Sequence, residues 1–342
     1  VIEGPDGQTK RRNGKMYKSK LSLIETERAI KFVKDTFERE LAAELELTRV
    51  TAPLFVLKGN GLNDDLNGVE RSVSFDIRET GKEAEVVHSL AKWKRHALGK
   101  YGFGVHTGIY TDMNAIRRDE VCDPLHSLYV DQWDWEKVIT AEDRNTAYLE
   151  ATVRQIYGVI RRVAAMVMEK YPDIKVQLPA DITFVSTQEL EDKYPEMSAR
   201  QRETHAAKQY GAVFLTGIGG TLKSGQKHDG RAPDYDDWKL NGDIIVHYPL
   251  LDCAMELSSM GIRVDKESLT NQLKAEGKEE RLGMPFHQAL MRDELPLTIG
   301  GGIGPSRLCM LMLEKAHVGE VQASIWPQAL VEECRANGIE LL

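Results

Sequence analysis

The chain has 342 residues, of which 42% are hydrophobic and 29% are charged. That balance is typical of a folded globular protein and excludes a largely disordered one. The net charge is −8, from 45 Lys and Arg against 53 Asp and Glu. An acidic balance argues against a nucleic-acid partner, because phosphate binding usually requires a basic excess.

The sequence also indicates where the protein works. Its apolar runs are shorter than a bilayer-spanning helix needs, and the N-terminal segment VIEGPDGQTKRRNGK has no apolar stretch behind its basic residues, unlike a signal peptide. The four cysteines form no CxxC pair, which predicts reduced thiols. We expect a cytoplasmic protein without membrane contact, with a polar tail over residues 1–18 and one domain over residues 19–342.

The first predicted elements are a long helix and a strand. Apolar residues recur at three- and four-residue spacings over residues 23–47, which predicts an amphipathic helix. Residues 48–57 favour a strand, and Pro53 removes one ladder donor, so this strand is expected at an edge or an interface. After a turn-rich stretch, we expect strands over 72–77, 85–88, 105–110 and 127–135, and helices over 89–99 and 142–170.

The second half of the chain continues the mixture of helices and strands. We expect strands over 182–185, 212–216, 243–248 and 254–264, helices over 266–276 and 279–291, a strand over 295–299 that enters a glycine cluster, and a helix from Pro305. Strands joined by turns, without regular alternation with helices, favour an α+β fold over a doubly wound sheet.

A glycine-rich segment, TIGGGIGPSRLCMLM over residues 298–312, is the first candidate binding site. Its glycines let the backbone approach a ligand closely, and Pro305 suits the first turn of a helix. Arg307 then lies in that turn, where the helix dipole already favours an anion. The alternative is a glycine turn with a surface arginine, and this segment alone does not decide between the two.

The segment IRRDEVCDPLHSLYVDQWDWE, residues 116–136, is the second candidate. Arg117 and Arg118 precede a turn-forming stretch and then a strand. On an extended chain Gln132 and Asp134 share one face and the two tryptophans share the other. An amide beside a carboxylate suits an amino-acid ligand, whose ammonium group Asp134 could hold. A half-solvated sheet with buried tryptophans is the alternative, but it does not explain the paired arginines.

Two acidic segments complete the set. RAPDYDDW (231–238) with the following Asn-Gly-Asp places four aspartates within thirteen residues, either as a rigid acidic loop or as a solvated turn. ELSSMGIR (256–263) puts Glu256 and Ser258 on one face of a strand. A buried carboxylate needs a partner, so Glu256 either contacts a cation ligand or forms a simple ion pair.

Taken in order, these segments resemble the ammonia-dependent, AMP-forming asparagine synthetase family, whose catalytic domain is shared with the class II aminoacyl-tRNA synthetases, closest to those for aspartate. The resemblance extends from about residue 23 to residue 326 and is carried by VVHSLAKWKR (86–95), SLYVDQWDWE (127–136), RAPDYDDW (231–238), ELSSMGIRV (256–264) and TIGGGIGPSRL (298–308). It implies an α+β fold with an antiparallel sheet flanked by helices, and a homodimer through the segment that ends at Pro53.

The resemblance also implies an activity and its residues. The expected reaction joins ammonia to the side-chain carboxylate of L-aspartate through a β-aspartyl adenylate, with ATP as substrate and Mg²⁺ as cofactor. Arg117 matches the arginine on the α-phosphate and Arg307 the one at the γ-phosphate end, while Asp243 and Glu256 match Mg²⁺ contacts. Further matches are Asp64, Ser89, Lys94, Gln132, Asp134, Asp236 and Ser259 in the aspartate pocket, and Ser127, Tyr235, Asp243, Arg263 and Gly302 on the nucleotide side.

Two points stay open at the level of sequence. Ammonium must lose a proton before it can attack, and either Asp64 or Asp236 could attract the cation and accept that proton. The family also usually carries a longer loop between DDW and NGD than residues 238–240 provide. Since no cysteine lies near the amino terminus to act as a glutaminase nucleophile, glutamine is expected to be a poor nitrogen donor.

Two rival functions fit the same resemblance. An aspartyl-type tRNA synthetase paralogue would usually carry an anticodon-binding module, for which a catalytic core spanning this chain leaves no room. A catalytically silent regulatory paralogue should have damaged phosphate arginines or metal carboxylates, but Arg117, Arg307, Asp243 and Glu256 are all present. Both rivals are therefore disfavoured relative to the ligase.

Overall fold

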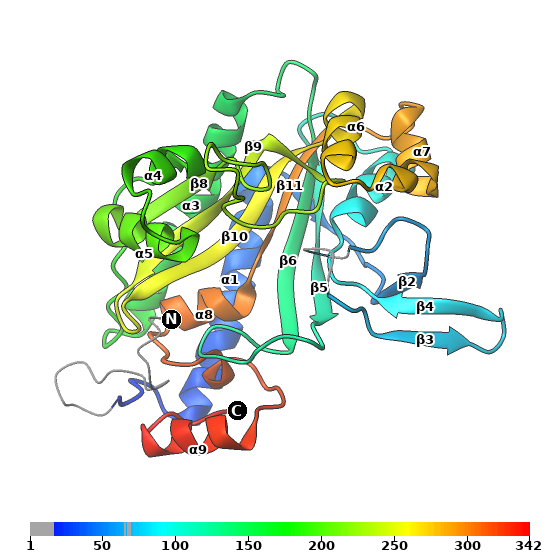
Figure 1. Ribbon diagram of the computed structural model, residues 1–342. Helices are drawn as coiled ribbons and strands as arrows, with labels where there is room; N and C mark the ends of the chain where they lie inside the picture. The colour runs from blue at the N-terminus through cyan, green and yellow to red at the C-terminus, as the bar shows by residue number, and fades with distance from the viewer. Residues whose placement is uncertain (1–16, 65, 67–69) are drawn as a thin grey trace.

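The computed structural model describes residues 17–64, 66 and 70–342. Its centre is an eight-stranded sheet with the order β1-β5-β6-β11-β10-β9-β8-β7, antiparallel except for the edge pairs β1–β5 and β7–β8 (Figure 1). The strands are β1 (Leu47–Arg49), β5 (Gly108–Ile116), β6 (Tyr129–Val138), β7 (Thr183–Ser186), β8 (Ala212–Thr216), β9 (Asp236–Tyr248), β10 (Cys253–Arg263) and β11 (Thr298–Ile303). The expected antiparallel sheet is confirmed.

A second, smaller sheet lies beside the first. It pairs β2 (Phe55–Leu57), β4 (Lys82–Val86) and β3 (Ser74–Ile77) in the order β2-β4-β3, and Figure 1 shows it extending away from the large sheet. The single strand predicted over 48–57 is wrong, because this stretch forms β1 in one sheet and β2 in the other, with Pro53 between them. Proline lacks the donor that a continuous ladder would require.

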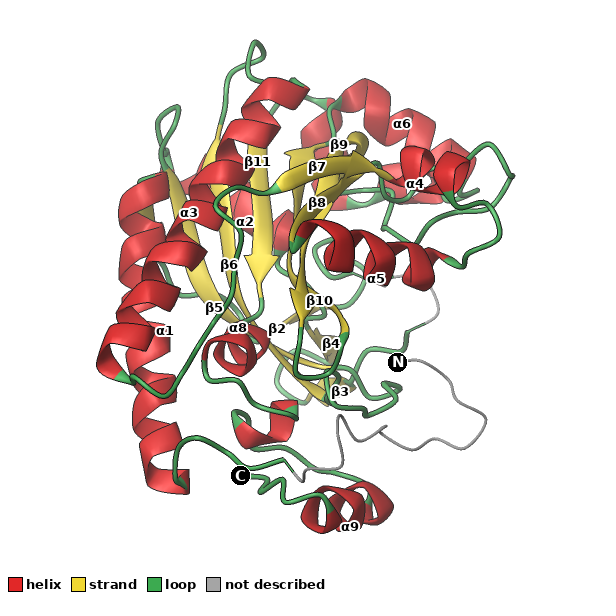
Figure 2. Cartoon of the chain, turned by 90° about the vertical axis from the view of Figure 1, so that its left-hand side faces the viewer, coloured by secondary structure: helices red, strands yellow, loops and turns green. Residues whose placement is uncertain are grey.

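Helices cover both faces of the large sheet. The long helices α1 (Leu23–Leu45) and α3 (Thr146–Lys170) lie together over one face (Figure 2), and their apolar stripes join the buried Trp133 and Trp135 of β6 in the main core. The other helical elements are α2 (Ala91–Tyr101), α4 (Thr187–Lys193), α5 (Ala199–Tyr210), α6 (Lys266–Ala275), η1 (Glu279–Gly283), α7 (Pro285–Met291), α8 (Pro305–Met312), η2 (Val318–Glu320) and α9 (Gln328–Ala336).

Several predicted boundaries differ from the structure. The glycine cluster after residue 299 is part of a strand, since β11 runs to Ile303 with Gly300 paired to Glu136 of β6. The helix predicted over 279–291 is two elements, because Pro285 starts α7 and holds Met284 in an extended conformation. Helices α4 and α5 were not predicted, although the capping boxes at Ser186 and Ser198 signal both starts.

The short DDW–NGD connection has a simple structural outcome. Strand β9 runs without interruption from Asp236 to Tyr248, so the position of the longer family loop is occupied here by strand. Most of the predicted N-terminal tail lies outside the described residues, but Tyr17 is anchored, with its hydroxyl donating to Glu320 at 2.9 Å. Within the described part of the chain, no helix has the length and apolar character needed to cross a bilayer.

Candidate active site

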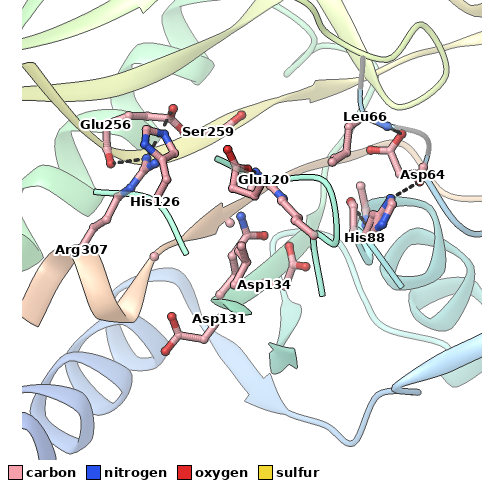
Figure 3. Close-up of a pocket in the computed structure, with 18 of the residues that line it drawn as sticks. Asp64, Leu66, His88, Glu120, His126, Asp131, Asp134, Glu256, Ser259 and Arg307 are labelled. Carbon is pink, nitrogen blue, oxygen red and sulfur yellow. Dashed lines mark hydrogen bonds and ion pairs between the residues drawn. The ribbon is translucent and has the colours of Figure 1, made fainter. Parts of the chain in front are cut away.

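A cavity of about 430 Å³ opens on the sheet face opposite α1 and α3, a size typical of small-molecule sites. Strands β6, β10 and β11 form its floor, and the segments that follow β5 and β8 contribute to its walls. Figure 3 shows Glu256 and Arg307 towards one end of the cavity, and Asp64 and His88 towards the other. Of the residues predicted for the site, those that line it are Asp64, Arg117, Asp236, Arg307, Ser89, Gln132, Asp134, Ser259, Ser127, Tyr235, Arg263, Gly302 and Glu256.

The two predicted phosphate arginines reach this same cavity from distant parts of the chain. Arg117 follows the end of β5, and its closest carboxylate is Glu120 at 3.9 Å. Arg307 lies in the first turn of α8, where Pro305 starts the helix as predicted; its guanidinium is 3.7 Å from the Glu256 carboxylate. Both side chains are about one-quarter exposed. Arg307 also donates to the carbonyl oxygens of Leu125 (3.3 Å) and Glu256 (3.1 Å). Both guanidinium groups thus meet carboxylates only at long ion-pair distances, which leaves positive charge available to an anion.

The alternation predicted for β6 is confirmed. Trp133 and Trp135 are buried in the core, where Trp133 stacks on Phe37 with ring centroids 4.9 Å apart, and Gln132 and Asp134 line the cavity on the opposite face. The reason is the two-residue period of a strand.

Lys94 lies behind the cavity wall. Its ammonium group donates to Asp134 and to the carbonyl oxygens of Trp135 (3.0 Å) and Gly301 (3.1 Å). These contacts use all three donors of the lysine, and burial lowers its pKa. The structure thus places Lys94 as a support for Asp134 and not among the cavity-lining residues.

An ion-pair network crosses beneath the cavity floor. Arg263 of β10 binds the fully buried Glu136 at 2.7 Å and also pairs with Asp236. Burial opposes the ionised form of Glu136, but Arg263 outweighs it and lowers the pKa of that carboxyl. Thr298 donates a further bond to Glu136 at 2.7 Å. These contacts fix the side chains of Asp236 and Arg263 at the floor.

The glycines of β11 make room for this network. A Cβ atom on Gly300 would collide with the Glu136 carboxylate, and one on Gly302 would lie 2.5 Å from Oε1 of Gln132. The strand therefore consists of glycine where polar side chains of β6 cross it. In this structure it is side chains of the protein that approach this backbone closely, and the predicted approach of a ligand stays a prediction.

Arg231, which precedes β9, was not predicted as a site residue. It is about nine-tenths buried, and it binds Asp243 at 2.6 Å and donates to Ser259. Asp243 is consequently not among the residues that line the cavity. The sequence carried a weak signal, because Arg231 begins the RAPDYDDW segment, but spacing alone could not show that its side chain turns inwards.

A β-bulge alters the predicted face of β10. The pairing with β9 shifts between Glu256 and Ser258, so Leu257 is an extra residue. Glu256 and Ser259 therefore line the cavity, whereas Ser258 is buried. The predicted pairing of Glu256 with Ser258 on one face is wrong for this reason.

The donor set at Glu256 and Asp243 suits a hard cation. Burial raises the pKa of Asp243; Arg231 opposes the shift, and the negative charge of Glu256 adds to it. Two neighbouring carboxylates of this kind are oxygen ligands that Mg²⁺ prefers. No group of three or more His, Cys, Asp or Glu side chains is arranged as a metal site within residues 17–64, 66 and 70–342.

His88 is a second residue that the sequence did not single out. It is 2% exposed and lies after β4, with Nδ1 3.2 Å from the carbonyl oxygen of Asp64. A carbonyl can only accept, so Nδ1 carries the hydrogen. Burial lowers the pKa of His88, which favours the neutral ring and leaves a lone pair on Nε2.

Comparison with known proteins identifies the family. The aspartate–ammonia ligase family model matches residues 24–338. The chain belongs to that family. The aspartate–ammonia ligase of Clostridium perfringens is 60% identical over 96% of this chain and 98% of its own length. Ligases of that name from Fusobacterium nucleatum and Levilactobacillus brevis are 59% and 57% identical over 95% of this chain, and 99% and 98% of their own lengths.

Solved structures confirm the fold expected for this ligase family. An asparaginyl-tRNA synthetase from Pyrococcus horikoshii, complexed with asparaginyl-adenylate, superposes with a TM-score of 0.66 at 14% identity, over 89% of this chain and 70% of that one. An asparaginyl-tRNA synthetase from Entamoeba histolytica gives 0.63 at 13% identity, over 88% and 66%. The catalytic-domain fold of class II tRNA synthetases is thus confirmed for this member of the ligase family.

Proposed function

We propose that this protein is an aspartate–ammonia ligase, which makes L-asparagine, AMP and pyrophosphate from L-aspartate, ammonia and ATP. The observation that carries the proposal is that Arg117 and Arg307 line one cavity together with Gln132 and Asp134. Two guanidinium groups suit a polyphosphate, and the amide with its carboxylate suits an amino acid.

The amino-acid end of the cavity is prepared for a cation. One oxygen of Asp134 and one of Asp236 are buried without a hydrogen-bond partner among the described residues. An orphaned buried carboxylate oxygen is costly, and an ammonium group would satisfy it. We assign the α-amino group of aspartate to Asp134, with Gln132, Ser89 and Ser259 as hydrogen-bonding partners of the substrate carboxylates.

The nucleotide lies along the other end in this proposal. Arg117 holds the α-phosphate and Arg307 the far end of a bent triphosphate, while Tyr235, Ser127, Arg263 and the backbone at Gly302 contact the nucleoside. An oxygen of the aspartate side chain attacks the α-phosphorus, the bond to the bridging oxygen breaks, and pyrophosphate leaves. The two arginines stabilise the negative charge that develops on the phosphates.

We assign Mg²⁺ to Glu256, which lines the cavity, and to Asp243, which becomes available when the Arg231 side chain moves away from it. When bound, the ion neutralises phosphate charge.

Ammonia completes the reaction by attacking the acyl carbon of the adenylate and expelling AMP. Of the two candidate proton acceptors, Asp236 is paired with Arg263, and a carboxylate paired with a cation is the weaker base. We propose that Asp64 attracts ammonium and takes one proton from it, and that the ammonia so formed attacks.

The test separates the two half-reactions. Purified protein with ATP, Mg²⁺ and aspartate should catalyse aspartate-dependent exchange of pyrophosphate into ATP, and should yield asparagine and AMP only when ammonium is added. Glutamine should be a poor substitute. Product formation that requires tRNA, or no adenylate formation at all, would contradict the proposal.

An exposed sheet edge bears on the assembly of the protein. β1 is an edge strand of the large sheet and follows directly on the long helix α1, which suits pairing with a second copy. We propose that the protein is a homodimer in the cytoplasm and that it has no nucleic-acid partner. Light scattering of the purified protein at micromolar concentration should give twice the chain mass, and a monomer would contradict the dimer.

A further inference from the structure

A second cavity, of about 180 Å³, lies next to the first and is not used by the mechanism above. Its walls come from the segment after β2, from strand β4 and from the η1–α7 region. Asp64 and Glu70 line both cavities. Gly59 at its edge is exposed, while Lys92 and Asp234 on its inner side are buried. The two cavities thus adjoin at Asp64 and Glu70, which form the partition between them.

The charges of the small cavity are arranged unevenly. Its cations belong to an internal cluster, in which Asp234 binds Lys92 at 3.1 Å and Arg281 at 3.2 Å. His287 adds a third contact to Asp234 at 2.9 Å. The carboxylates of Glu70 and Glu85 lie in the remaining wall, where Glu85 accepts a bond from Ser72 at 2.5 Å. This wall is therefore suited to attract a small cation.

His88 lines the large cavity beside Asp64, which belongs to both cavities. The charged groups that act on its ring include Glu85, which lines the small cavity, Arg117, which lines the large one, and Glu70, which lines both. Its Nε2 atom is buried and has no hydrogen-bond partner among the described residues. Because Nδ1 donates to the Asp64 carbonyl, Nε2 presents a lone pair, which can accept an N–H bond from ammonia but cannot donate one.

We propose that ammonium enters through the small cavity, gives up its proton at Asp64 on the partition, and passes to the adenylate as ammonia held by Nε2 of His88. This inference rests on the proposed function and adds the route of its nitrogen substrate. One N–H bond of ammonium breaks, the proton moves to an Asp64 carboxylate oxygen and then to water through Glu70 or Glu85, and the lone pair stays on nitrogen. The positive charge of Arg117 beyond the partition disfavours passage of the charged form.

The first test uses charge. Glu85→Gln keeps the shape of the wall and removes its charge, so the KM for ammonium should rise on the order of threefold to tenfold at low ionic strength. Glu83→Gln on the same strand is the matched control, because Glu83 is exposed, pairs with Lys58 and does not line the cavity. Hydroxylamine, a nucleophile that is largely uncharged at neutral pH, should be used equally well by both variants.

The second test blocks the route. Ser72→Trp should fill the small cavity and lower amide formation from both ammonium and hydroxylamine at least tenfold, while aspartate-dependent pyrophosphate exchange continues. Ser74→Trp, on an exposed position of β3, should leave both activities unchanged. Amide formation at the wild-type rate in Ser72→Trp would overturn the route.

The outcomes distinguish the route from the reaction. If Ser72→Trp also loses pyrophosphate exchange through misfolding, Glu85→Gln decides, and an unchanged KM for ammonium would overturn the proposal. If the wild-type protein itself forms no adenylate or no amide, it is the proposed function that fails. His88→Gln, which can place an acceptor near Nε2, should retain more ammonia-dependent activity than His88→Asn, which can only replace Nδ1; the reverse order would contradict the role of Nε2.

Discussion

The floor of the large cavity and its phosphate end are built on opposite principles. At the floor, Lys94 and Arg263 are buried, and each makes a short contact with a buried carboxylate. Lys94 binds Asp134, and Arg263 binds Glu136. At the phosphate end, Arg117 and Arg307 are partly exposed and meet carboxylates only at 3.9 and 3.7 Å. In the first region the cations are already paired before any ligand arrives, whereas the second keeps cationic charge available. Rigidity therefore serves amino-acid recognition, and weak internal pairing serves anion capture.

The largest effect that would test this contrast is on stability. Glu136→Gln should lower the free energy of unfolding by about 3–5 kcal/mol, because it leaves buried Arg263 and Lys94 without their common counter-charge. Urea denaturation of this variant and of Glu79→Gln, an exposed control on the turn after β3, measures the difference. A loss no larger than that of the control would show that the floor does not depend on its charges.

The next largest effect is a loss of catalytic rate that leaves the stability of the fold unchanged. Arg307→Gln should slow aspartate-dependent pyrophosphate exchange about 10²- to 10³-fold, as loss of a charge-stabilising donor does, and should leave the unfolding midpoint nearly unchanged. Arg335→Gln on the exposed face of α9 is the control. If aspartate binding, measured by calorimetry, weakened as much as ATP use, the assignment of Arg307 to the phosphate end would be wrong.

A smaller effect should appear where the two regions meet. Gly302→Ala places a methyl group against the flexible Gln132 side chain, which must shift, and should raise the KM for aspartate about tenfold. In Gly304→Ala the new Cβ would be 3.8 Å from that of Arg307, an ordinary contact, so steady-state kinetics should change little. Equal effects at both positions would argue that the cavity tolerates no added volume anywhere along this segment.

The smallest expected effect needs no mutation. Raising the salt concentration from about 0.05 M to about 0.5 M should increase the KM for ATP severalfold, because partly exposed charges are screened. The KM for aspartate should change less, since its proposed contacts are buried. The same salt sensitivity for both substrates would remove the distinction between the two ends.

Much of this arrangement could be read from the sequence because it depends on local periodicity. The stripe of α1, the strand at 212–216 and the alternation in β6 follow from spacing alone. The position of Arg307 follows from Pro305, which fixes where α8 begins. These features belong to single elements, so no knowledge of their neighbours is required.

The remaining features depend on how elements meet. The sequence could not show that β11 continues through its glycines, since that follows from side chains of β6 crossing the strand. Nor could it show that Arg231 turns inwards to Asp243, or that His88 lies against Asp64 in the cavity wall. Each is a tertiary contact between residues of different segments, which the periodicity within one helix or strand cannot predict.

The bulge at Leu257 gives β10 a property that a regular strand lacks. With one extra residue, a carboxylate and a hydroxyl three positions apart face the same ligand, although ordinary alternation would set them on opposite sides. If the same residues formed a regular strand without the bulge, either Glu256 or Ser259 would turn into the protein interior. The bulge thus determines whether the residues assigned to the phosphate end and to the amino-acid end share one surface.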